Sequence, residues 1–539
     1  MAHGVTVPKR HRDPRQNGKI PRIVLKLLAA MKTELQAEKR KSISELHRSR
    51  YKRNSISKNA DESRRRRLAI DQALRRKHRE QLITAKRFRH LTQQEEYESA
   101  GEEEGDYRIS YELSAADISR IEEELKSNNH EVRLDAAKYL ARALFDPSKA
   151  VRDFVVDGEC VNILTQLLTS GDAEEQLQGV VCITNISAGS YELCIKATPT
   201  IPYLISYLNE SNVALQDQSG WAIGNMAVEG DEIRNMLRRN GVLSPLINLL
   251  DATDSHLVQT ACFALSNLAR GPDAKLEEFF DAGIVPKLTS HLINNTPDTV
   301  TEICWVLSYL TAGTDQFIGK VVEQGVVPLL VQNLAPLQTQ GPLALPLIRT
   351  FGNIASGPDE YTDVLLSQDM FLPGLIVLCN SDCRPVKKES LWVLSNITAS
   401  RRPQVLEKVI QAGAIPVLTE IASHTNFDIR KEAAFSLTNI ACHGDKYIQA
   451  LPNNVLLPGY LEFVRSEDPE LIKLGLTYLQ LLLTHVPQGK ALMQAIPDSI
   501  YSLESVTLST HSDLCRTASV LMDTYFGENN EGVEQDILA

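Results

Sequence analysis

The sequence lacks the short motifs that mark common enzyme sites. It has no glycine-rich phosphate-binding loop, no His and Cys set at metal-ligand spacing and no nucleophile elbow, and its 12 histidines are dispersed. We therefore expect no enzymatic activity, no metal and no cofactor. It also has no uninterrupted run of 18 apolar residues, because the best candidate, from Leu474 to Leu492, contains His485, Gln488 and Lys490. No membrane span is expected.

The cysteines follow neither a disulfide pattern nor a zinc pattern. There are nine, an odd number, and the chain starts with no recognisable secretory signal peptide, so we expect a reducing compartment. The closest pair, Cys379 and Cys383, has no second pair or histidine neighbours at zinc-finger spacing. These two are predicted to be small buried apolar residues, and so are Cys182, Cys262, Cys304 and Cys442.

One polar residue recurs at a nearly fixed interval. The series has steps of 40 to 44 residues and consists of Asn185, Asn225, Asn267, Tyr309 in place of asparagine, Asn353, Asn396 and Asn439. A period of about 40 to 47 residues is typical of stacked armadillo or HEAT helical units. The fold class predicted is all-α, a right-handed armadillo-repeat superhelical solenoid with a basic, largely disordered or helical N-terminal arm.

A second series supports the first. Prolines recur at steps of 41 to 45 residues, at Pro202, Pro245, Pro286, Pro328, Pro373, Pro416 and Pro458. Several follow a glycine closely, as in Gly283-Ile284-Val285-Pro286, which predicts that one helix ends at the glycine and the next begins near the proline. We expect about ten units over residues 113–528, including atypical ends that cap the stack.

Charge divides the chain into two parts. Residues 1–92 hold 27 Lys and Arg against 8 Asp and Glu, a net charge of +19, whereas residues 93–539 hold 30 against 60, a net charge of -30. Opposite blocks on one chain suggest either a basic arm that reaches an outside partner or one that folds back on the acidic body. The acidic, glycine-containing stretch 93–112 is predicted to be a flexible linker, and residues 529–539 an acidic tail.

The basic part contains two candidate helices. Residues 1–60 are predicted to be a mostly disordered arm with a short amphipathic helix from Val24 to Leu35, which could dock on a protein or lie on an anionic membrane. Residues 61–92 are rich in arginine, uninterrupted by proline or glycine, and should become helical on an acidic partner surface. Their cations are Arg64, Arg65, Arg66, Arg67, Arg75, Arg76, Lys77, Arg79, Lys86, Arg87 and Arg89.

An aromatic residue stands four places before several members of the polar series, on the same helix face. The aromatics are Trp221, Phe263, Trp305, Trp392 and Phe435, and three of them follow an acid by three residues, at Glu302, Glu389 and Glu432. In one interpretation the rings are core packing and the asparagines tie one unit to the next. In the other, solvent-accessible rings hold the stems of Lys and Arg, amides hold a peptide backbone, and carboxylates take the charged ends.

Two other functions use the same features. A general armadillo scaffold would bind acidic or apolar ligands, although acids beside the aromatics favour cationic ones. A nucleic-acid-binding arm is also conceivable because clustered arginines attract phosphate. Aromatics that could stack on bases are scarce in residues 1–90, so we do not expect nucleic acid as a partner.

Several strings resemble successive repeats of the importin-α family. They are residues 219–225, 303–310, 349–354, 387–398 and 430–439, among them Ser219-Gly220-Trp221-Ala222-Ile223-Gly224-Asn225, and the match runs in order from about residue 175 to 450. Residues 63–90 resemble that family's importin-β-binding domain, and an arginine-rich start is also found in a divergent importin-α-like branch. The resemblance implies an adaptor, found in cytoplasm and nucleus, that binds nuclear localisation signals and hands cargo to importin-β.

The resemblance also implies two peptide sites. The N-terminal, major-site-like set is Asn185, Gly189, Trp221, Asn225, Glu229, Phe263, Asn267, Glu302 and Trp305. The C-terminal, minor-site-like set is Arg349, Asn353, Asp359, Thr362, Glu389, Trp392, Asn396, Glu432, Phe435 and Asn439. Lys86-Arg87-Phe88-Arg89 is similar to the family's internal signal mimic, which implies self-inhibition by the arm.

The chain departs from the family pattern at four positions. Val181 and Phe263 stand where tryptophan is expected, Glu229 replaces an aspartate and Cys194 a threonine. The N-terminal site therefore keeps one indole of three, whereas the C-terminal site keeps Trp392 with Phe435 as its neighbour. We expect the chain to favour the C-terminal site or to bind an atypical signal.

Overall fold

The computed structural model describes residues 113–271, 274–293 and 295–527, and this part of the chain consists of helices without a strand. The predicted arm 1–60, arginine-rich segment 61–92, linker 93–112 and tail 529–539 lie outside the described residues. The described helices form a first pair, α3 and α4, and nine sets of three when α18 and α19 are counted as one interrupted helix. The division of the chain into segments stays a prediction.

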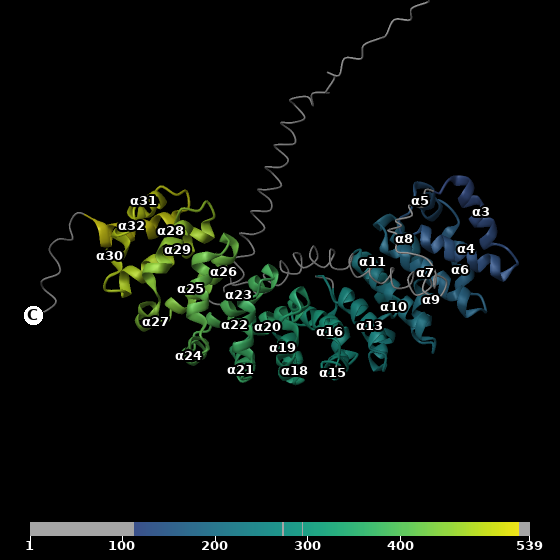
Figure 1. The fold of residues 1–539 in the computed structure, drawn as a ribbon, viewed down its shortest axis with the longest axis horizontal. Helices are drawn as coiled ribbons and strands as arrows, with labels where there is room; N and C mark the ends of the chain where they lie inside the picture. The colour runs from purple at the N-terminus through teal and green to yellow at the C-terminus, as the bar shows by residue number, and fades with distance from the viewer. Residues whose placement is uncertain (1–112, 272–273, 294, 528–539) are drawn as a thin grey trace, which may run out of the picture.

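One helix of each set packs against its counterpart in the next set, and we call these the inner helices. They are α4 (His130–Ala143), α7 (Ala173–Ala188), α10 (Val213–Val228), α13 (Ser255–Leu268), α16 (Pro297–Leu310), α20 (Leu345–Ser356), α23 (Arg384–Thr398), α26 (Phe427–Ala441), α29 (Pro469–His485) and α32 (Ser512–Phe526). Figure 1 shows them as one curved row from α4 to α32. The positions of the predicted polar series fall on α7 to α26.

The remaining helices pack against the inner helices, and α15, α18, α21 and α24 lie along the convex edge of the row (Figure 1). They are α3 (Ala115–Leu125), α5 (Lys149–Val156), α6 (Cys160–Leu168), α8 (Tyr191–Ala197), α9 (Ile201–Leu208), α11 (Asp231–Arg239), α12 (Leu243–Asn248), α14 (Leu276–Asp281), α15 (Ile284–Ser290), α17 (Asp315–Glu323), α18 (Val326–Gln332), α19 (Leu334–Gln338), α21 (Asp359–Leu366), α22 (Phe371–Cys379), α24 (Pro403–Gln411), α25 (Ala414–His424), α27 (Asp445–Ala450), α28 (Asn453–Val464), α30 (Gly489–Gln494) and α31 (Ser499–Thr507).

Short sequence signals set the ends of these helices. Gly283 and Gly413 adopt left-handed φ angles of 71° and 84°, which glycine tolerates at no steric cost, and each directly precedes a helix. Pro286 and Pro416 are the third residues of α15 and α25, where a missing N–H breaks no intrahelical bond. The predicted glycine and proline breaks are confirmed at these positions. Pro458 differs, because it lies inside α28.

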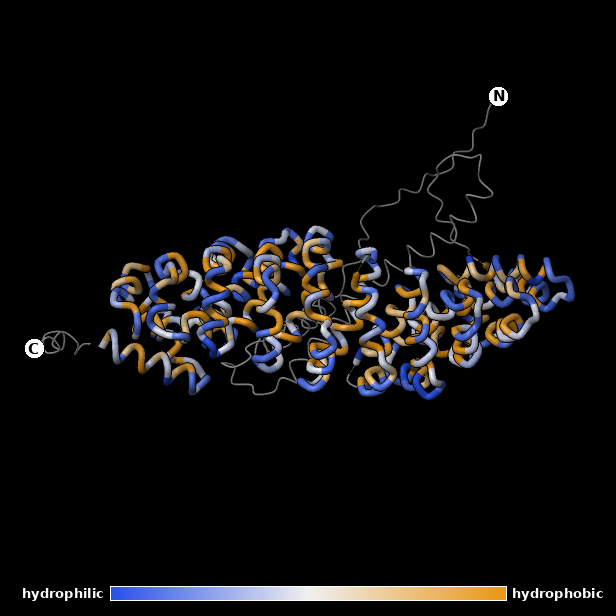
Figure 2. The backbone as a smooth tube through the Cα atoms, turned by 90° about the horizontal axis from the view of Figure 1, so that it is seen from below, coloured by the Kyte–Doolittle hydropathy of each residue, from blue (hydrophilic) through white to orange (hydrophobic). Residues whose placement is uncertain are grey.

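The apolar core is as long as the row of helices. One cluster of buried residues runs from Ile118 to Tyr478, and a second, from Leu457 to Leu521, continues it in the last units. Figure 2 shows hydrophobic residues along the whole tube and not in one central region. Each unit therefore buries its apolar face against its neighbours, which is how a solenoid is stabilised.

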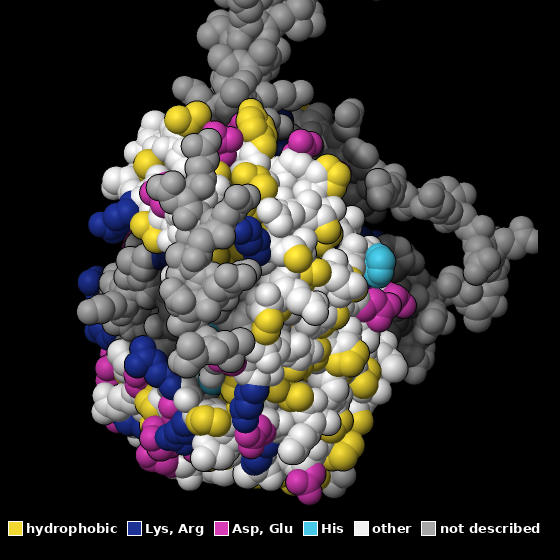
Figure 3. All heavy atoms as spheres, turned by 90° about the vertical axis from the view of Figure 1, so that its left-hand side faces the viewer, with side chains coloured by type: hydrophobic (Ala, Val, Ile, Leu, Met, Phe, Trp, Pro, Cys, Tyr) yellow, Lys and Arg dark blue, Asp and Glu magenta, His cyan; other side chains and the backbone are white. Residues whose placement is uncertain are grey.

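The C-terminal end of the row leaves some hydrophobic side chains exposed. Tyr501, Leu508 and Val520 are the most exposed large hydrophobic residues of the last unit, and hydrophobic side chains lie among polar ones on the face that this end presents (Figure 3).

No single helix of the described ranges is long and apolar enough to cross a membrane. The pair α21 and α22 passes that test only together and is bent by 92° at its break.

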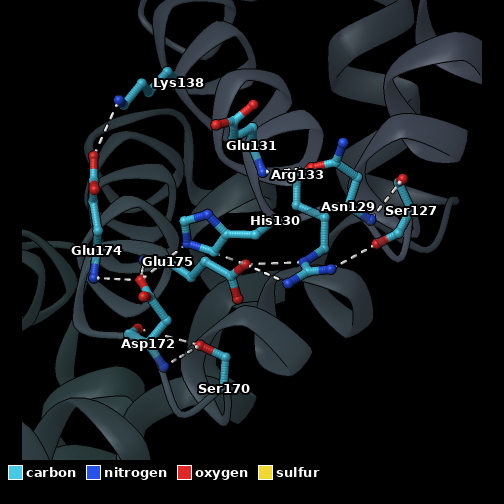
Figure 4. A network of polar contacts seen from close by, with 10 residues as sticks. All are labelled: Ser127, Asn129, His130, Glu131, Arg133, Lys138, Ser170, Asp172, Glu174 and Glu175. Carbon is cyan, nitrogen blue, oxygen red and sulfur yellow. Dashed lines mark hydrogen bonds and ion pairs between the residues drawn. The ribbon is translucent and has the colours of Figure 1, made fainter.

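A polar network joins the first two inner helices (Figure 4). Arg133 of α4 donates from Nε and Nη2 to Oε1 of Glu175 on α7, at 3.0 and 2.6 Å, and the Glu175 side chain is only 3% exposed. Asp172 caps α7 by accepting from the N–H groups of Glu174 and Glu175. The N–H of Glu175 and the nearby His130 ring lower the pKa of Asp172, so this cap stabilises α7 at neutral pH and loses that effect as the pH falls through the lowered pKa.

Replacing Glu175 should therefore loosen the junction between α4 and α7. We expect Glu175→Ala to lower the local stability by roughly 2 kcal/mol, because two charge-assisted hydrogen bonds to a buried carboxylate are lost. Glu174→Ala is the matched control, since Glu174 pairs with Lys138 at 3.1 Å but is 54% exposed, and an exposed pair contributes about 0 to 1 kcal/mol. Hydrogen exchange of the α4 and α7 amides measures the difference, and equal effects of the two changes would refute it.

Candidate functional site

The asparagines of the polar series form a ladder along the inner helices. In each, Nδ2 donates to a backbone carbonyl of the preceding inner helix. The pairs are Asn185 to Ala141 (2.8 Å), Asn225 to Thr184 (3.4 Å), Asn267 to Gly224 (3.1 Å), Asn353 to Ser308 (2.9 Å), Asn396 to Gly352 (3.1 Å) and Asn439 to Ser395 (3.0 Å). The interpretation that these asparagines tie one unit to the next is thus confirmed for one N–H of each amide, and an amide nitrogen carries two.

The amide oxygen has no hydrogen-bond partner among the described residues in two of the ladder asparagines. Asn225 and Asn439 are each 1% exposed, and within the described part of the chain their Oδ1 atoms are buried acceptors with no hydrogen-bond donor. A buried acceptor without a donor costs about 1 to 3 kcal/mol. Asn225 lies on α10 within the N-terminal candidate set and Asn439 on α26 at the end of the C-terminal set, so each set contains a buried amide oxygen that lacks a donor in that part of the chain.

The aromatic rings lie among the ladder residues but are less accessible than the peptide interpretation requires. Trp221, Trp305 and Trp392 are 7%, 4% and 2% exposed, so the expectation of solvent-accessible rings is wrong for this structure. Packing between neighbouring units contributes to this burial for two of the rings. Trp221 stacks on Phe263 with ring centroids 4.5 Å apart, and a Cβ at Gly352 would lie 1.9 Å from the Trp392 ring, so that ring lies directly over the glycine.

Trp305 already has a cation on its face. The guanidinium carbon of Arg349 lies 5.6 Å from the Trp305 ring centroid, and Nη2 of Arg349 is 3.6 Å from Oε1 of Glu389. An indole and a carboxylate from neighbouring inner helices thus hold one arginine inside the protein. The same two kinds of group are what the sequence assigns to binding cationic side chains of a ligand.

The remaining candidates lie on or beside the same helices. Gly189 and Glu229 cap the C-terminal ends of α7 and α10. Glu302 of α16 and Glu432 of α26 are 4% and 0% exposed. Asp359 begins α21 directly after α20, and Thr362 one turn later is fully buried. The inner helices therefore carry the N-terminal set on α7 to α16 and most of the C-terminal set on α20, α23 and α26, whereas Asp359 and Thr362 lie on α21, which is not an inner helix.

Sequence reasoning missed Arg402. Its Nε lies 3.5 Å from Oδ2 of Asp359, its Nη2 lies 3.2 Å from Oε1 of Glu360, and its Nη1 donates to Asp363. Asp359, a predicted ligand-binding acid, is therefore paired with an arginine of the next unit. The available signal was an arginine pair, Arg401 and Arg402, one repeat length after a cluster of acids.

The structure agrees with most of the cysteine predictions. Cys182, Cys262, Cys304 and Cys379 are buried, and burial raises the pKa of Cys379 to about 12. Cys383 is half-buried. The prediction for Cys442 is wrong, because it follows the last residue of α26 and its side chain is exposed. No group of His, Cys, Asp and Glu able to hold a metal occurs in the part of the chain that the structure describes.

Comparison with known proteins identifies the repeat and the family. The Armadillo/beta-catenin-like repeat model matches residues 230–270 and 402–442. Importin subunit alpha-2 of Oryza sativa subsp. japonica is 34% identical over 520 residues, which cover 90% of this chain and 97% of that protein. Importin subunit alpha-9 of Arabidopsis thaliana is 32% identical over 442 residues, covering 77% of this chain and 85% of that protein. The chain belongs to the importin-α family.

The fold comparison agrees with this assignment. The crystal structure of an engineered protein superposes with a TM-score of 0.66 at 27% identity, covering 76% of this chain and 98% of the engineered protein. The predicted fold class, an all-α armadillo solenoid, is confirmed, and so is the predicted membership of the importin-α family, whose proteins are nuclear-import adaptors. The cations assigned to importin-β binding or self-inhibition, Arg64 to Arg89, lie outside the described residues.

Two features of this importin-α depart from what the sequence led us to expect of the family. Phe263, which stands in place of a tryptophan, stacks on Trp221 and does not stand apart from it as a separate ring. Arg402 pairs with Asp359 and two further acids of α21. One departure affects each half of the candidate site.

Proposed function

We propose that this importin-α binds nuclear localisation signals on the face formed by α7 to α26, links them to importin-β through residues 61–92, and moves between cytoplasm and nucleus. The observation that carries the proposal is the pair of buried, unpartnered Oδ1 atoms of Asn225 and Asn439. An extended peptide presents backbone N–H groups that can satisfy them without regard to peptide sequence.

Charge around the two oxygens favours a cationic ligand. Glu302, Glu389 and Glu432 lie on α16, α23 and α26, and the internal arrangement of Arg349 on Trp305 and Glu389 is a working example of arginine binding. Residues 93–539 also carry a net charge of -30. A general armadillo scaffold for acidic or apolar ligands would place these carboxylates against like charge or leave them unpaired, so it is the weaker alternative.

The two asparagines provide a direct test. We expect Asn225→Ala and Asn439→Ala each to weaken binding of a fluorescent lysine-rich peptide by about tenfold, because each removes one buried hydrogen bond worth about 1 to 1.5 kcal/mol. Asn333→Ala is the control, since Asn333 also donates across units, to Leu292 O at 2.8 Å, but lies between α18 and α19. Unchanged affinity in both variants, or an equal loss in Asn333→Ala, would reject the peptide site.

A further inference from the structure

Two rings from adjacent units are in direct contact near the start of the candidate site. Trp221 on α10 and Phe263 on α13 stack with centroids 4.5 Å apart and an interplanar angle of 25°. They form a cluster apart from the main core, with Ala188 of α7 packed against them. Their contact therefore joins two neighbouring inner helices and is separate from the main apolar core.

This contact leaves no room for a side chain between the rings. Carbon atoms in contact are about 3.5 to 4.0 Å apart, so an aliphatic stem held between two ring faces needs a separation of about 7 to 8 Å. The observed 4.5 Å is ordinary ring stacking. The space between these two rings, which we call the first slot, is closed.

The residue before each ladder position explains why the slot closes here. A Cβ built at Gly224 would lie 2.4 Å from Cε1 of Phe263, so the Phe263 ring occupies space that any larger residue would fill. Most other inner helices carry a hydroxyl residue at the equivalent position, namely Thr184, Ser266, Ser308, Ser395 and Thr438. Gly352 is the exception, and there Trp392 lies over the glycine in the same manner.

We propose that Gly224 and Phe263 together remove one lysine-stem contact from the N-terminal half of the candidate peptide site, so that the peptide residue passing between α10 and α13 is not selected for lysine. This inference rests on the proposed peptide-binding function. The ligand class is an extended cationic peptide that tolerates a small or apolar residue at one interior position, with cations on either side of it. Gly224 has no Cβ and so leaves space for the Phe263 ring, and that ring fills the first slot.

The test uses the full chain and five synthetic peptides. One carries four consecutive lysines between glycine and serine flanks, and each of the others has one lysine replaced by alanine. Fluorescence anisotropy gives the dissociation constants. In the native protein we expect one interior replacement to change affinity less than twofold. In Gly224→Ser, where the serine Cβ displaces Phe263, the same replacement should cost about 3- to 10-fold, as expected for one cation–aromatic contact.

A second variant protects the test against misfolding. Phe263→Ala removes the ring that fills the slot. Replacing the interior lysine that the native protein tolerates losing should then weaken binding in this variant too. Thermal unfolding measures whether both variants remain folded. If the four-lysine peptide does not bind the native chain, the proposed function fails. If it binds but every replacement costs as much in the native chain as in Gly224→Ser and Phe263→Ala, the closed slot has no role and this inference fails alone.

Discussion

Replacing Lys86, Arg87 and Arg89 by alanine should raise the affinity for a basic cargo peptide by up to on the order of 1,000-fold. These residues form the segment that resembles an internal signal mimic, and the acidic stretch 93–112 joins it to the solenoid. A short flexible tether gives an effective concentration that can reach the millimolar range. Against a segment that binds with a dissociation constant of about 1 μM, competition of this strength costs a cargo about 4 kcal/mol.

The measurement is anisotropy of a labelled lysine-rich peptide with the full-length variant. A matched control removes three cations elsewhere in the arm, Lys9, Arg10 and Arg12, and should leave affinity within a few fold. On this hypothesis the mutated segment competes for the peptide site, whereas the control residues contribute only to long-range charge, which is screened within about 8 Å at physiological salt. Equal gains in both variants, or no gain in either, would show that the arm does not compete for the peptide site.

Neutralising the arginine-rich segment should abolish capture by importin-β. We expect replacement of Arg64 to Arg67 and Arg75 to Lys77 by glutamine to eliminate a pull-down at physiological salt. Hydrogen bonds to charged groups contribute about 1.5 to 3 kcal/mol each. Even if only three of the seven cations make such bonds, their loss costs about 5 kcal/mol, or more than about 1,000-fold in affinity. The sequence predicts that the segment is a marginal helix alone, and we expect its folding on an acidic partner to depend on these charges.

The control for this experiment changes as many cations in the preceding stretch. Arg10, Arg12, Arg15, Lys19, Arg22, Lys26 and Lys32 supply seven, the same number as the test set. If net charge alone drives association, both variants lose importin-β to the same extent. Retained binding in the control and loss in the test variant would locate the site in residues 61–92.

The repeat architecture was predictable because each unit repeats the same local signals. The spacing of Asn185 to Asn439 and the glycine and proline breaks depend on helix periodicity and helix ends, which are properties of neighbouring residues. They predicted the inner helices that the structure shows. The family followed from the strings around Trp221 and Trp392, since ordered motifs over several units are specific.

Contacts between units were not predictable in the same way. The amide nitrogen of Asn225 donates to Thr184 O, and the Phe263 ring lies over Gly224; both depend on how closely two inner helices approach. Arg402 reaches three acids of α21 for the same reason. A glycine directly before a ladder asparagine was the visible signal for a displaced ring. The binding of cargo by the candidate residues stays a prediction.

The ladder has a mechanical consequence. Each of its amides bonds through nitrogen to the preceding repeat, and in Asn225 and Asn439 the oxygen of the same group has no donor within the described ranges, which under the proposed function a bound strand would supply. A strand held by both oxygens would bridge distant repeats in addition to the bonds between adjacent ones. The loaded array would then resist bending and stretching more than the empty one, so that cargo binding and elasticity would be two measures of the same hydrogen bonds.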